Sequence, residues 1–412
     1  MNGTIRISKC RICNGTNLES IIDFGEMALT GIFALDGSSV DKEPLELIRC
    51  SNCGLAQLRN SYDSKILYGD SYGYESHLNE SMRKHLQRKA ILLEKKFLNN
   101  KEQNTVVDIA SNDGTFLSYF SKKNNKYVGV DPLIGVVSDH YPANAIKIKD
   151  FFSAEAYLKQ NPTKADLVTS MSVIYDLDDP VGFAKDVYRI LKDEGVWHFE
   201  QSYLPTMTST NSFDTICHEH LLYLTLKDIK LILEKAKFQI LNLSLNEING
   251  GSIAVTAIKT KAILDTDPFF DFLLRKEEKE GFGSSSALKN FALLTVEKKK
   301  EFIELLLHYK EKGFEIVALG ASTKGNVLLQ YYEIDNNLIK KIGDINYKKF
   351  GKKTPGTNIT IVAESEIVND SHEKMIAVVL PWHFRISISE NCQSFIDKGG
   401  RLLFPLPNIE IV

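Results

Sequence analysis

The sequence predicts an α/β protein in three parts: a small N-terminal zinc-binding module followed by two Rossmann-like domains. Two observations carry this prediction. Two pairs of closely spaced cysteines lie near the N-terminus, and two separate stretches alternate buried-type strands with helices. The chain has 412 residues, more than one hydrophobic core usually spans, so several domains are expected.

The cysteine spacing predicts the first part. Four of the six cysteines are arranged as Cys10-x-x-Cys13 and Cys50-x-x-Cys53, and the other two are isolated. Each turn can bring two thiolates to one Zn²⁺, and two turns complete a closed tetrahedron with no open position for water. A redox pair is the alternative. We therefore predict a structural zinc ion in a module over residues 1–68.

The middle part begins with a basic helix over residues 81–97 and continues as alternating strands and helices. Buried strands are expected over residues 106–110, 127–131, 166–170 and 195–200. The clearest helix between them covers residues 183–192. This alternation predicts a parallel, doubly wound sheet in a domain over residues 69–285. The polar segment 277–286, rich in glycine and serine, is expected to be a linker.

The C-terminal part repeats the alternation of strands and helices without a detectable sequence repeat of the middle part. A long helix over residues 288–312 is followed by expected strands over residues 315–319, 341–344, 374–380 and 401–404. A second Rossmann-like domain over residues 286–412 follows from this pattern.

Composition narrows the classes of partner. The net charge of −3 gives no reason to expect nucleic acid, which requires concentrated Lys and Arg. The first residues lack an apolar signal core, and no stretch approaches the roughly 20 apolar residues of a membrane span. We therefore expect a cytoplasmic protein, acting as a monomer, with neither a membrane nor a nucleic acid as partner.

A ligand loop is predicted after the first strand of the middle domain. The strand ending at Asp108-Ile109 is followed by a turn with the sequence Ala110-Ser111-Asn112-Asp113-Gly114. This turn is not the G-x-G-x-x-G of a dinucleotide binder, which makes NAD less favoured. Asp131 ends the next strand, where a carboxylate can accept hydrogen bonds from both ribose hydroxyls of an adenosine. An α/β turn that binds nothing is the alternative.

The run His218-Glu219-His220 is the candidate for acid–base chemistry. An imidazole with a neighbouring carboxylate can act as a general base. A zinc-protease site is excluded because it needs H-E-x-x-H on a helix. Buried histidines that only satisfy structural hydrogen bonds are the alternative.

The turn over residues 319–326 is the candidate phosphate site. Ser322, Lys324 and Asn326 lie where a strand passes into a helix, and the turn also holds two glycines. Backbone N–H groups at a helix start, together with a lysine, can bind a diphosphate. The order of residues differs from that of a nucleotide-triphosphate loop, so ATP hydrolysis is not expected. A solvated helix start is the alternative.

Together these features resemble the sugar C-methyltransferases that act on thymidine-diphosphate-linked keto-deoxysugars in antibiotic and surface-polysaccharide pathways. Besides the four cysteines, the matching segments are Tyr72-x-Tyr74-x-Ser76, Ser111-Asn112-Asp113-Gly114, Asp214-Thr215-Ile216-x-His218-Glu219-His220, Asn249-Gly250-Gly251-Ser252, Gly320-Ala321-x-x-Lys324-Gly325-Asn326, Pro355-Gly356-Thr357, Pro381-Trp382 and Pro405-Leu406-Pro407. Each segment is short, but their joint order is specific and covers nearly the whole chain.

The resemblance implies a function for each part. The segment from Asp108 to Gly114 and Asp131 would hold S-adenosylmethionine, and the sugar nucleotide would lie between the middle and C-terminal domains. His220 would be the general base with Glu219 as its acidic partner, and His218 is the chief rival for the role of base. A base would remove a proton beside a ketone, and the enolate would attack the sulfonium methyl, which requires close positioning and stabilisation of the enolate oxygen.

The resemblance also implies which side chains would contact the sugar nucleotide. Tyr74 would lie near the sugar, and Tyr72 and Ser76 belong to the same substrate-facing segment. Lys324, with Ser322 and Asn326 nearby, would contact the diphosphate.

Two positions depart from the family pattern. Cys217 stands where the family carries tyrosine, and Tyr175 stands where it carries histidine. Both flank the expected active site and are further candidates there, and Tyr175 can supply a phenol from the other side. The departures keep two alternatives open: methylation at a sugar oxygen or nitrogen, and a non-catalytic zinc-ribbon binding protein.

Overall fold

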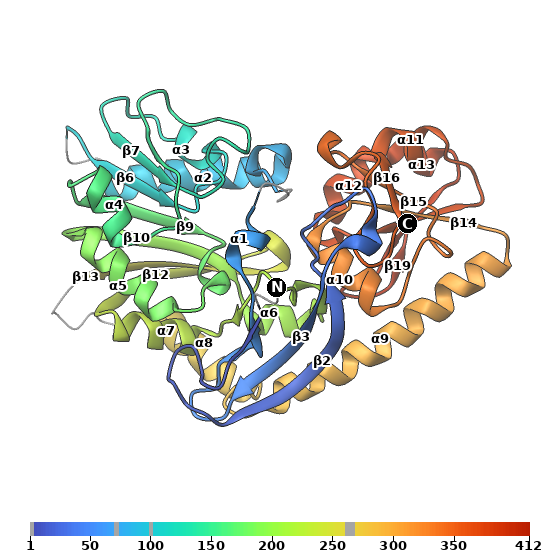
Figure 1. Cartoon of the computed structure of the whole chain (residues 1–412), viewed down its shortest axis with the longest axis horizontal. Coiled ribbons are helices and arrows are strands. Elements are labelled where there is room, and N and C mark those ends of the chain that lie inside the picture. The colour runs from blue at the N-terminus through green and yellow to red at the C-terminus, as the bar shows by residue number, and fades with distance from the viewer. Residues whose placement is uncertain (1–3, 70–73, 99–101, 260–267) are drawn as a thin grey trace.

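The computed structural model describes residues 4–69, 74–98, 102–259 and 268–412. Two α/β lobes face each other, and strands near the N-terminus run between them (Figure 1). The long helix α9 (Ser286–Glu311) extends from the middle lobe to the C-terminal lobe (Figure 1). This arrangement confirms the predicted class: a cysteine module, a Rossmann-like middle domain and a C-terminal domain with a mainly parallel sheet.

The N-terminal module is built on an antiparallel sheet with the strand order β11-β4-β3-β2. Its strands are β2 (Leu18–Ala28), β3 (Lys42–Cys50), β4 (Ala56–Leu58) and β11 (Leu222–Tyr223). A separate pair, β1 (Ile5–Arg6) and β5 (Asn60–Ser61), and the short helix α1 (Ser64–Leu67) complete it. Strand β11 follows directly on the His218-Glu219-His220 run, so the module's sheet holds this part of the middle domain in place.

The middle lobe contains a seven-stranded sheet with the order β12-β13-β10-β9-β6-β7-β8. The strands are β6 (Thr105–Ile109), β7 (Lys126–Val130), β8 (Ile146–Ile148), β9 (Ala165–Met171), β10 (Leu191–Ser202), β12 (Phe238–Asn246) and β13 (Ser252–Lys259). The helices are α2 (Glu80–Phe97), α3 (Thr115–Ser118), α4 (Ala154–Gln160), α5 (Pro180–Ile190), α6 (Leu204–Ser209), α7 (Leu226–Lys235) and α8 (Pro268–Lys279). The strands from β8 to β10 pair in parallel as predicted, because helical or loop crossovers join them. Strands β12 and β13 pair antiparallel and were not predicted.

The C-terminal lobe contains a six-stranded sheet with the order β16-β15-β14-β17-β18-β19. The strands are β14 (Glu315–Leu319), β15 (Lys341–Asp344), β16 (Thr360–Ala363), β17 (Met375–Val379), β18 (Arg401–Phe404) and β19 (Glu410–Ile411). The helices are α10 (Thr323–Tyr331), α11 (Glu364–Asn369), α12 (Arg385–Asn391) and α13 (Gln393–Asp397). Only β19 runs antiparallel in this sheet. The five-residue strand β17 has no exposed face, which explains its uninterrupted apolar sequence.

The predicted linker over residues 277–286 is wrong at its start. Glu277 lies inside α8 and is buried. Its Oε1 accepts hydrogen bonds from the Tyr203 hydroxyl at 2.6 Å and from the Leu226 N–H at 2.5 Å. Glu277 is therefore part of the core although it stands in a polar stretch of sequence, because hydrogen bonds from neighbouring elements compensate the burial of its carboxylate. The connection between the lobes is the turn over residues 280–285.

Each large sheet has one point at which the strand order reverses, between β6 and β9 in the middle lobe and between β14 and β17 in the C-terminal lobe. Ligands of open α/β sheets bind beyond the carboxyl ends of the strands at such a point. The loops concerned begin at Ala110, Ser172, Gly320 and Leu380. Across the described residues, none of the helices has the length and apolar character that crossing a bilayer requires.

Candidate active site and zinc centre

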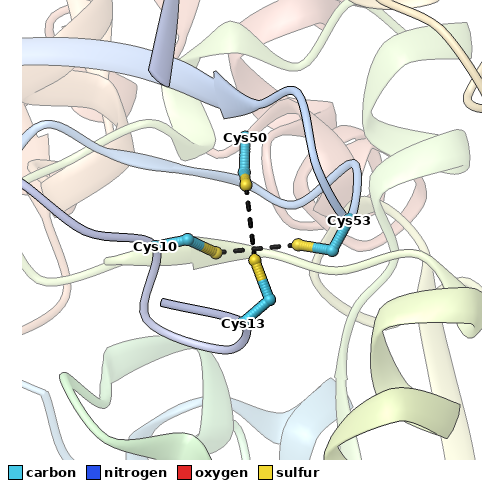
Figure 2. A group of neighbouring side chains, drawn as sticks. All are labelled: Cys10, Cys13, Cys50 and Cys53. Carbon is cyan, nitrogen blue, oxygen red and sulfur yellow. Dashed lines mark hydrogen bonds between the residues drawn. The ribbon is translucent and has the colours of Figure 1, made fainter. Parts of the chain in front are cut away.

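The four cysteines of the N-terminal module converge on one point (Figure 2). The Sγ atoms of Cys10 and Cys53 are 3.6 Å apart, and those of Cys13 and Cys50 are 3.5 Å apart. Four thiolates about 2.3 Å from one ion stand roughly 3.7 Å from each other, whereas a disulfide needs about 2.05 Å. The geometry therefore fits a closed Zn²⁺ site and excludes a disulfide.

Two similar turns position these thiolates. The Asn14 N–H donates to the Cys10 carbonyl at 3.0 Å, and the Gly54 N–H donates to the Cys50 carbonyl at 2.9 Å. Asn14 and Gly54 both adopt positive φ, at 61° and 101°, so each turn folds back on its first cysteine. The local sequence thus forms both halves of the site, and β3 holds one half where it meets the other.

The predicted cofactor loop follows β6 and has an unusual backbone. Ala110, Asn112 and Gly114 adopt positive φ values of 54°, 50° and 78°. Only Gly takes this conformation without cost, so the surrounding contacts hold the other two in place. The loop thus presents backbone groups at the carboxyl end of β6, beside the reversal of the strand order.

Asp131 lies beside this loop at the end of β7 and is buried. Its Oδ2 accepts the Asn112 N–H at 2.8 Å, and its Oδ1 accepts the Leu133 N–H at 2.7 Å. A carboxylate has about four acceptor positions, so it can still accept ribose hydroxyls. These residues fit S-adenosylmethionine. Asp108 lies further back, where the Thr169 hydroxyl donates to it at 2.7 Å and burial raises its pKa to about 7.

The segment that includes Ser76 supports the cofactor loop. The Ser76 N–H donates to Asn112 Oδ1 at 3.0 Å, and Asn112 Nδ2 donates to the Tyr74 carbonyl at 3.2 Å. Ser111 shares a hydrogen bond of 2.7 Å with the Tyr141 hydroxyl. Ser76 is thus tied to the loop in this structure, and its contact with substrate stays a prediction. Tyr72 lies outside the described residues.

His220 is partly exposed and has a defined orientation. Its Nδ1 lies 2.8 Å from the carbonyl oxygen of Thr215, which can only accept, so Nδ1 carries the proton. Nε2 therefore carries the free lone pair that a base needs. Burial and the positive charge of Lys324 lower the pKa of His220 to about 4, which keeps the ring neutral. Glu219 was expected to orient this ring, but the Thr215 carbonyl does so.

Glu219 and Cys217 turn toward the N-terminal module. The Thr30 hydroxyl donates to Glu219 Oε2 at 3.3 Å, and a hydrogen bond also joins Glu219 to the Cys217 thiol. Burial raises the pKa of both groups. Both side chains are buried. A contact of either one with substrate stays a prediction.

His218 does not share a face with His220. A turn, in which the His220 N–H donates to the Cys217 carbonyl at 3.0 Å, separates the two rings. His218 is fully buried, its Nε2 lies 3.2 Å from the Glu43 carbonyl, and its ring meets the Tyr62 ring edge-on. Burial lowers the pKa of His218 to about 4. The surroundings of His218 are those of a structural histidine.

Tyr175 lies against His220, with their ring centroids 4.3 Å apart. Burial raises the pKa of Tyr175 well above its usual value, so the phenol keeps its proton. Tyr74 is 43% exposed and close enough to act electrostatically on Tyr175. A small cavity of about 10 Å³ beside His220 and Tyr175 has room for one water molecule. A larger ligand must therefore approach His220 from its exposed side.

Lys324 reaches the same point from the C-terminal lobe. Its Nζ donates to the Asn249 carbonyl at 2.9 Å, and the ammonium lowers the pKa of His220. Burial lowers the pKa of Lys324, and the nearby Asp214 raises it. Asp214 Oδ2 in turn accepts the Trp382 Nε1–H at 2.9 Å. The two loops at the strand-order reversal of the C-terminal sheet thus contact the middle lobe, Lys324 at Asn249 and Trp382 at Asp214.

The two other predicted residues of this turn have structural partners. Ser322 Oγ accepts the Gly325 N–H at 3.1 Å and caps α10. Asn326 is fully buried, and its Nδ2 donates to the Thr30 carbonyl at 2.7 Å. Asn326 therefore joins the C-terminal lobe to the N-terminal module. Its burial argues against the predicted contact with a diphosphate.

The sequence reasoning singled out neither Asp214 nor Trp382 nor Asn249 as site residues. All three stand in the short segments that carry the family resemblance, so the signal was present. Asp176 was missed too. It lies in the loop after β9, and burial raises its pKa while the charge of Glu219 raises it further. No sequence pattern distinguishes it from the other acidic residues of that loop.

Three family models match the chain in succession. They are described as a zinc binding domain over residues 10–68, a methyltransferase domain over residues 74–243 and a C-methyltransferase C-terminal domain over residues 247–407. The chain is also 27% identical to C-methyltransferase NovU of Streptomyces niveus over 98% of its own length and 97% of that protein. The chain belongs to the zinc-containing C-methyltransferases. It is a C-methyltransferase that depends on S-adenosylmethionine, and its substrate is a small molecule.

Two solved structures among those similar to this methyltransferase resemble it only in part. CalO1, a methyltransferase in calicheamicin biosynthesis, is 13% identical, with 44% of this chain and 56% of that chain covered and a TM-score of 0.34. Magnesium protoporphyrin IX methyltransferase of Synechocystis PCC 6803 is 13% identical, with 48% and 89% covered and a TM-score of 0.32. These scores are too low to bear on function, so the family matches carry the assignment. The family matches favour methylation at carbon over methylation at oxygen or nitrogen, and an enzyme over a non-catalytic binding protein.

Proposed function

We propose that this enzyme methylates a carbon atom beside the ketone of a nucleotide-diphosphate-linked deoxysugar, with His220 as the general base. The observation that carries the proposal is the position of His220. Its ring packs against Tyr175, from the loop at the middle sheet's reversal, with the ring centroids 4.3 Å apart. Lys324, from the corresponding loop of the C-terminal sheet, is close enough for its charge to lower the pKa of His220. A sugar nucleotide that touches both lobes would bring its ring to this point.

Removal of the proton is assigned to Nε2 of His220. Because Nδ1 donates to the Thr215 carbonyl, the ring has one fixed tautomer and the other nitrogen can accept a proton. The lowered pKa of about 4 keeps the imidazole unprotonated at neutral pH. The base is therefore available, although it is weaker than a histidine in water.

Stabilisation of the enolate oxygen is assigned to Tyr175. A phenol with a strongly raised pKa keeps its proton and can donate it in a hydrogen bond. A donor held beside the base stabilises the negative charge that develops when the proton leaves. The phenol thus takes the place of the imidazole that other members of the family carry there.

The methyl group comes from S-adenosylmethionine, which the loop from Ala110 to Gly114 and the carboxylate of Asp131 would hold. The new carbon–carbon bond forms as the sulfur–methyl bond breaks. The cofactor would leave as the uncharged thioether, and the proton would stay on His220 until solvent removes it.

The diphosphate of the substrate is assigned to the start of α10. Lys324 is partly exposed, and the first turn of this helix has N–H groups without helical partners. A phosphate bound there, next to the sugar, would leave the sugar ring within reach of His220. In the absence of substrate the ammonium donates to the Asn249 carbonyl at 2.9 Å, and the nearby Asp214 raises the pKa of Lys324.

Deuterium exchange tests the proposal without requiring turnover. The enzyme is mixed in D₂O with a thymidine-diphosphate-linked keto-deoxysugar and S-adenosylhomocysteine, and label at the carbon beside the ketone is followed by NMR. We expect exchange with the natural enzyme. With His220→Asn, exchange and methylation should both fall about 10²–10⁴-fold while S-adenosylhomocysteine still binds.

His218→Asn serves as the matched control. This variant should melt at a lower temperature, because it disturbs a buried contact, but its folded fraction should still exchange deuterium. If His220→Asn exchanges at a normal rate and His218→Asn does not, His218 is the base. If the natural enzyme shows no exchange, the proposal that a keto-deoxysugar is the substrate is wrong.

A further inference from the structure

A second group of side chains that can ligate a metal lies at the cofactor loop. His77 comes from the segment before α2, Asp113 from the cofactor loop and His140 from the loop after β7. One ligand atom from each lies within 4.8 Å of those of the other two. His77 and His140 have no role in the reaction proposed above, and Asp113 belongs to the loop that would hold the cofactor.

The geometry of the three side chains is that of ligands around one ion. His77 Nδ1 lies 2.9 Å from Asp113 Oδ2, and the two imidazole rings have their centroids 4.3 Å apart. Adjacent ligands of an octahedral ion with bonds of 2.0–2.1 Å stand roughly 3 Å apart. Two imidazoles and a carboxylate on one face are the ligands that hold non-haem Fe²⁺ and related divalent ions.

The backbone fixes the three residues to each other before any ion binds. The His77 N–H donates to Asp113 Oδ2 at 2.9 Å, and the His140 N–H donates to the Asp113 carbonyl at 2.8 Å. Asp113 Oδ1 accepts the Thr115 N–H at 3.0 Å. The carboxylate is fully buried, whereas His140 is exposed, so an ion can enter from solvent.

The neighbouring charges favour a cation. Glu75 Oε2 lies 3.9 Å from His77 Nδ1, close enough to act from behind the ligands. The nearby lysines are neutralised: Lys348 pairs with Glu75 at 2.6 Å, and Lys147 pairs with Asp139 at 2.5 Å. The site therefore has an excess of negative charge from Asp113.

We propose that His77, Asp113 and His140 form a second metal site, which takes a divalent transition-metal ion such as Zn²⁺, Co²⁺ or Ni²⁺. The three side chains leave the remaining coordination positions to water, in contrast to the closed cysteine site. Three segments of the chain meet at this ion, one of which is the cofactor loop. The bound ion would therefore hold Asp113 and the start of α3 in place.

Cobalt is a probe that distinguishes the two sites. The zinc-loaded full-length enzyme is titrated with Co²⁺, and binding is followed by equilibrium dialysis and visible absorption. We expect one additional Co²⁺ per chain, with the weak bands of nitrogen and oxygen ligands. Intense sulfur-to-cobalt bands would show that cobalt had replaced zinc at the cysteines, and with no other bound cobalt this result overturns the proposal.

Three variants test the ligands. His77→Ala and His140→Ala should each weaken Co²⁺ binding about tenfold or more, and neither removes a buried side chain. His372→Ala is the matched control. His372 is also an exposed histidine close to a carboxylate, 3.5 Å from Glu315, but this pair includes no second histidine. Its affinity for Co²⁺ should be that of the natural enzyme. Equal binding by all four proteins, or no binding by the natural enzyme, overturns the proposal.

Discussion

The strand order reverses between β6 and β9 in the middle lobe and between β14 and β17 in the C-terminal lobe, and different chemistry lies at the two points. The middle lobe presents a loop with positive φ and the carboxylate of Asp131, which suit the hydroxyls and amine of a nucleoside cofactor. The C-terminal lobe presents a helix start and the ammonium of Lys324, which suit an anion. Sheets of similar topology thus present different side chains at their reversal points, and these side chains, not the strand order, decide what can bind there.

The N-terminal module holds the two lobes together. Thr30 accepts a hydrogen bond from Asn326 of the C-terminal lobe and donates one to Glu219 of the middle lobe. Gln330 also bonds both to the N–H and to the carbonyl of Ala28, at 2.8 and 3.0 Å. The two lobes therefore keep their relative position, and with it the candidate site, only while the N-terminal module is folded.

Loss of zinc should have the largest effect, because it removes the module from both lobes at once. Structural zinc sites contribute on the order of 10–16 kcal/mol of binding free energy to folding. Cys13→Ser should therefore give insoluble or locally unfolded protein that binds neither ligand, as shown by metal analysis, circular dichroism and calorimetry. Cys392→Ala, a buried cysteine outside the site, should keep stoichiometric zinc. A zinc-free enzyme that stays folded and active would contradict this role.

Removal of the Asp131 carboxylate should affect the middle-lobe ligand alone. A hydrogen bond to a charged group contributes about 1.5–3 kcal/mol, so Asp131→Ala should weaken S-adenosylhomocysteine binding about ten- to a hundredfold. The KM of the sugar nucleotide should stay unchanged. Calorimetry and steady-state kinetics measure the two quantities, with a thermal melt to show that the loop remains folded. Unchanged cofactor affinity would place the ribose elsewhere.

Removal of the Lys324 charge should show the opposite selectivity. Lys324→Met keeps most of the aliphatic stem and loses the ammonium, which is partly exposed and so worth less than a buried charge. We expect the KM of the sugar nucleotide to rise about tenfold while S-adenosylhomocysteine binds normally. If cofactor binding falls instead, the assignment of the two ligands to the two lobes is wrong.

The smallest expected effect is a shift of the pH profile in Lys324→Met. It reports the interaction between Lys324 of the C-terminal lobe and His220 of the middle lobe. His220 acts as a base only when unprotonated, so activity should be lost as the pH falls through its lowered pKa of about 4. The positive charge of Lys324 disfavours the imidazolium, and Lys324→Met should therefore move the acid limb of kcat/KM to higher pH by a fraction of a unit. A limb that does not move, or that moves to lower pH, would show that the two groups do not interact.

Much of this architecture follows from short stretches of sequence. Each C-x-x-C pair forms its turn from five or six consecutive residues, and a buried strand such as β17 is recognisable because every side chain in it is apolar. The cofactor loop and the start of α10 are local too, because each follows directly on such a strand. The division of the chain at residues 68 and 285 stays a prediction, and β11 shows that the sheet of the module crosses the first of these positions.

Tertiary structure alone decided how the side chains of the candidate site are oriented. Sequence alternation would put His218 and His220 on one face, but a turn directs the first to the Glu43 carbonyl and the second to the Thr215 carbonyl. Glu219 has its partner at Thr30, and Asp214 has its partner at Trp382, 168 residues away. A side chain takes the direction in which its polar atoms find partners, and these partners come from remote segments that spacing along the chain does not specify.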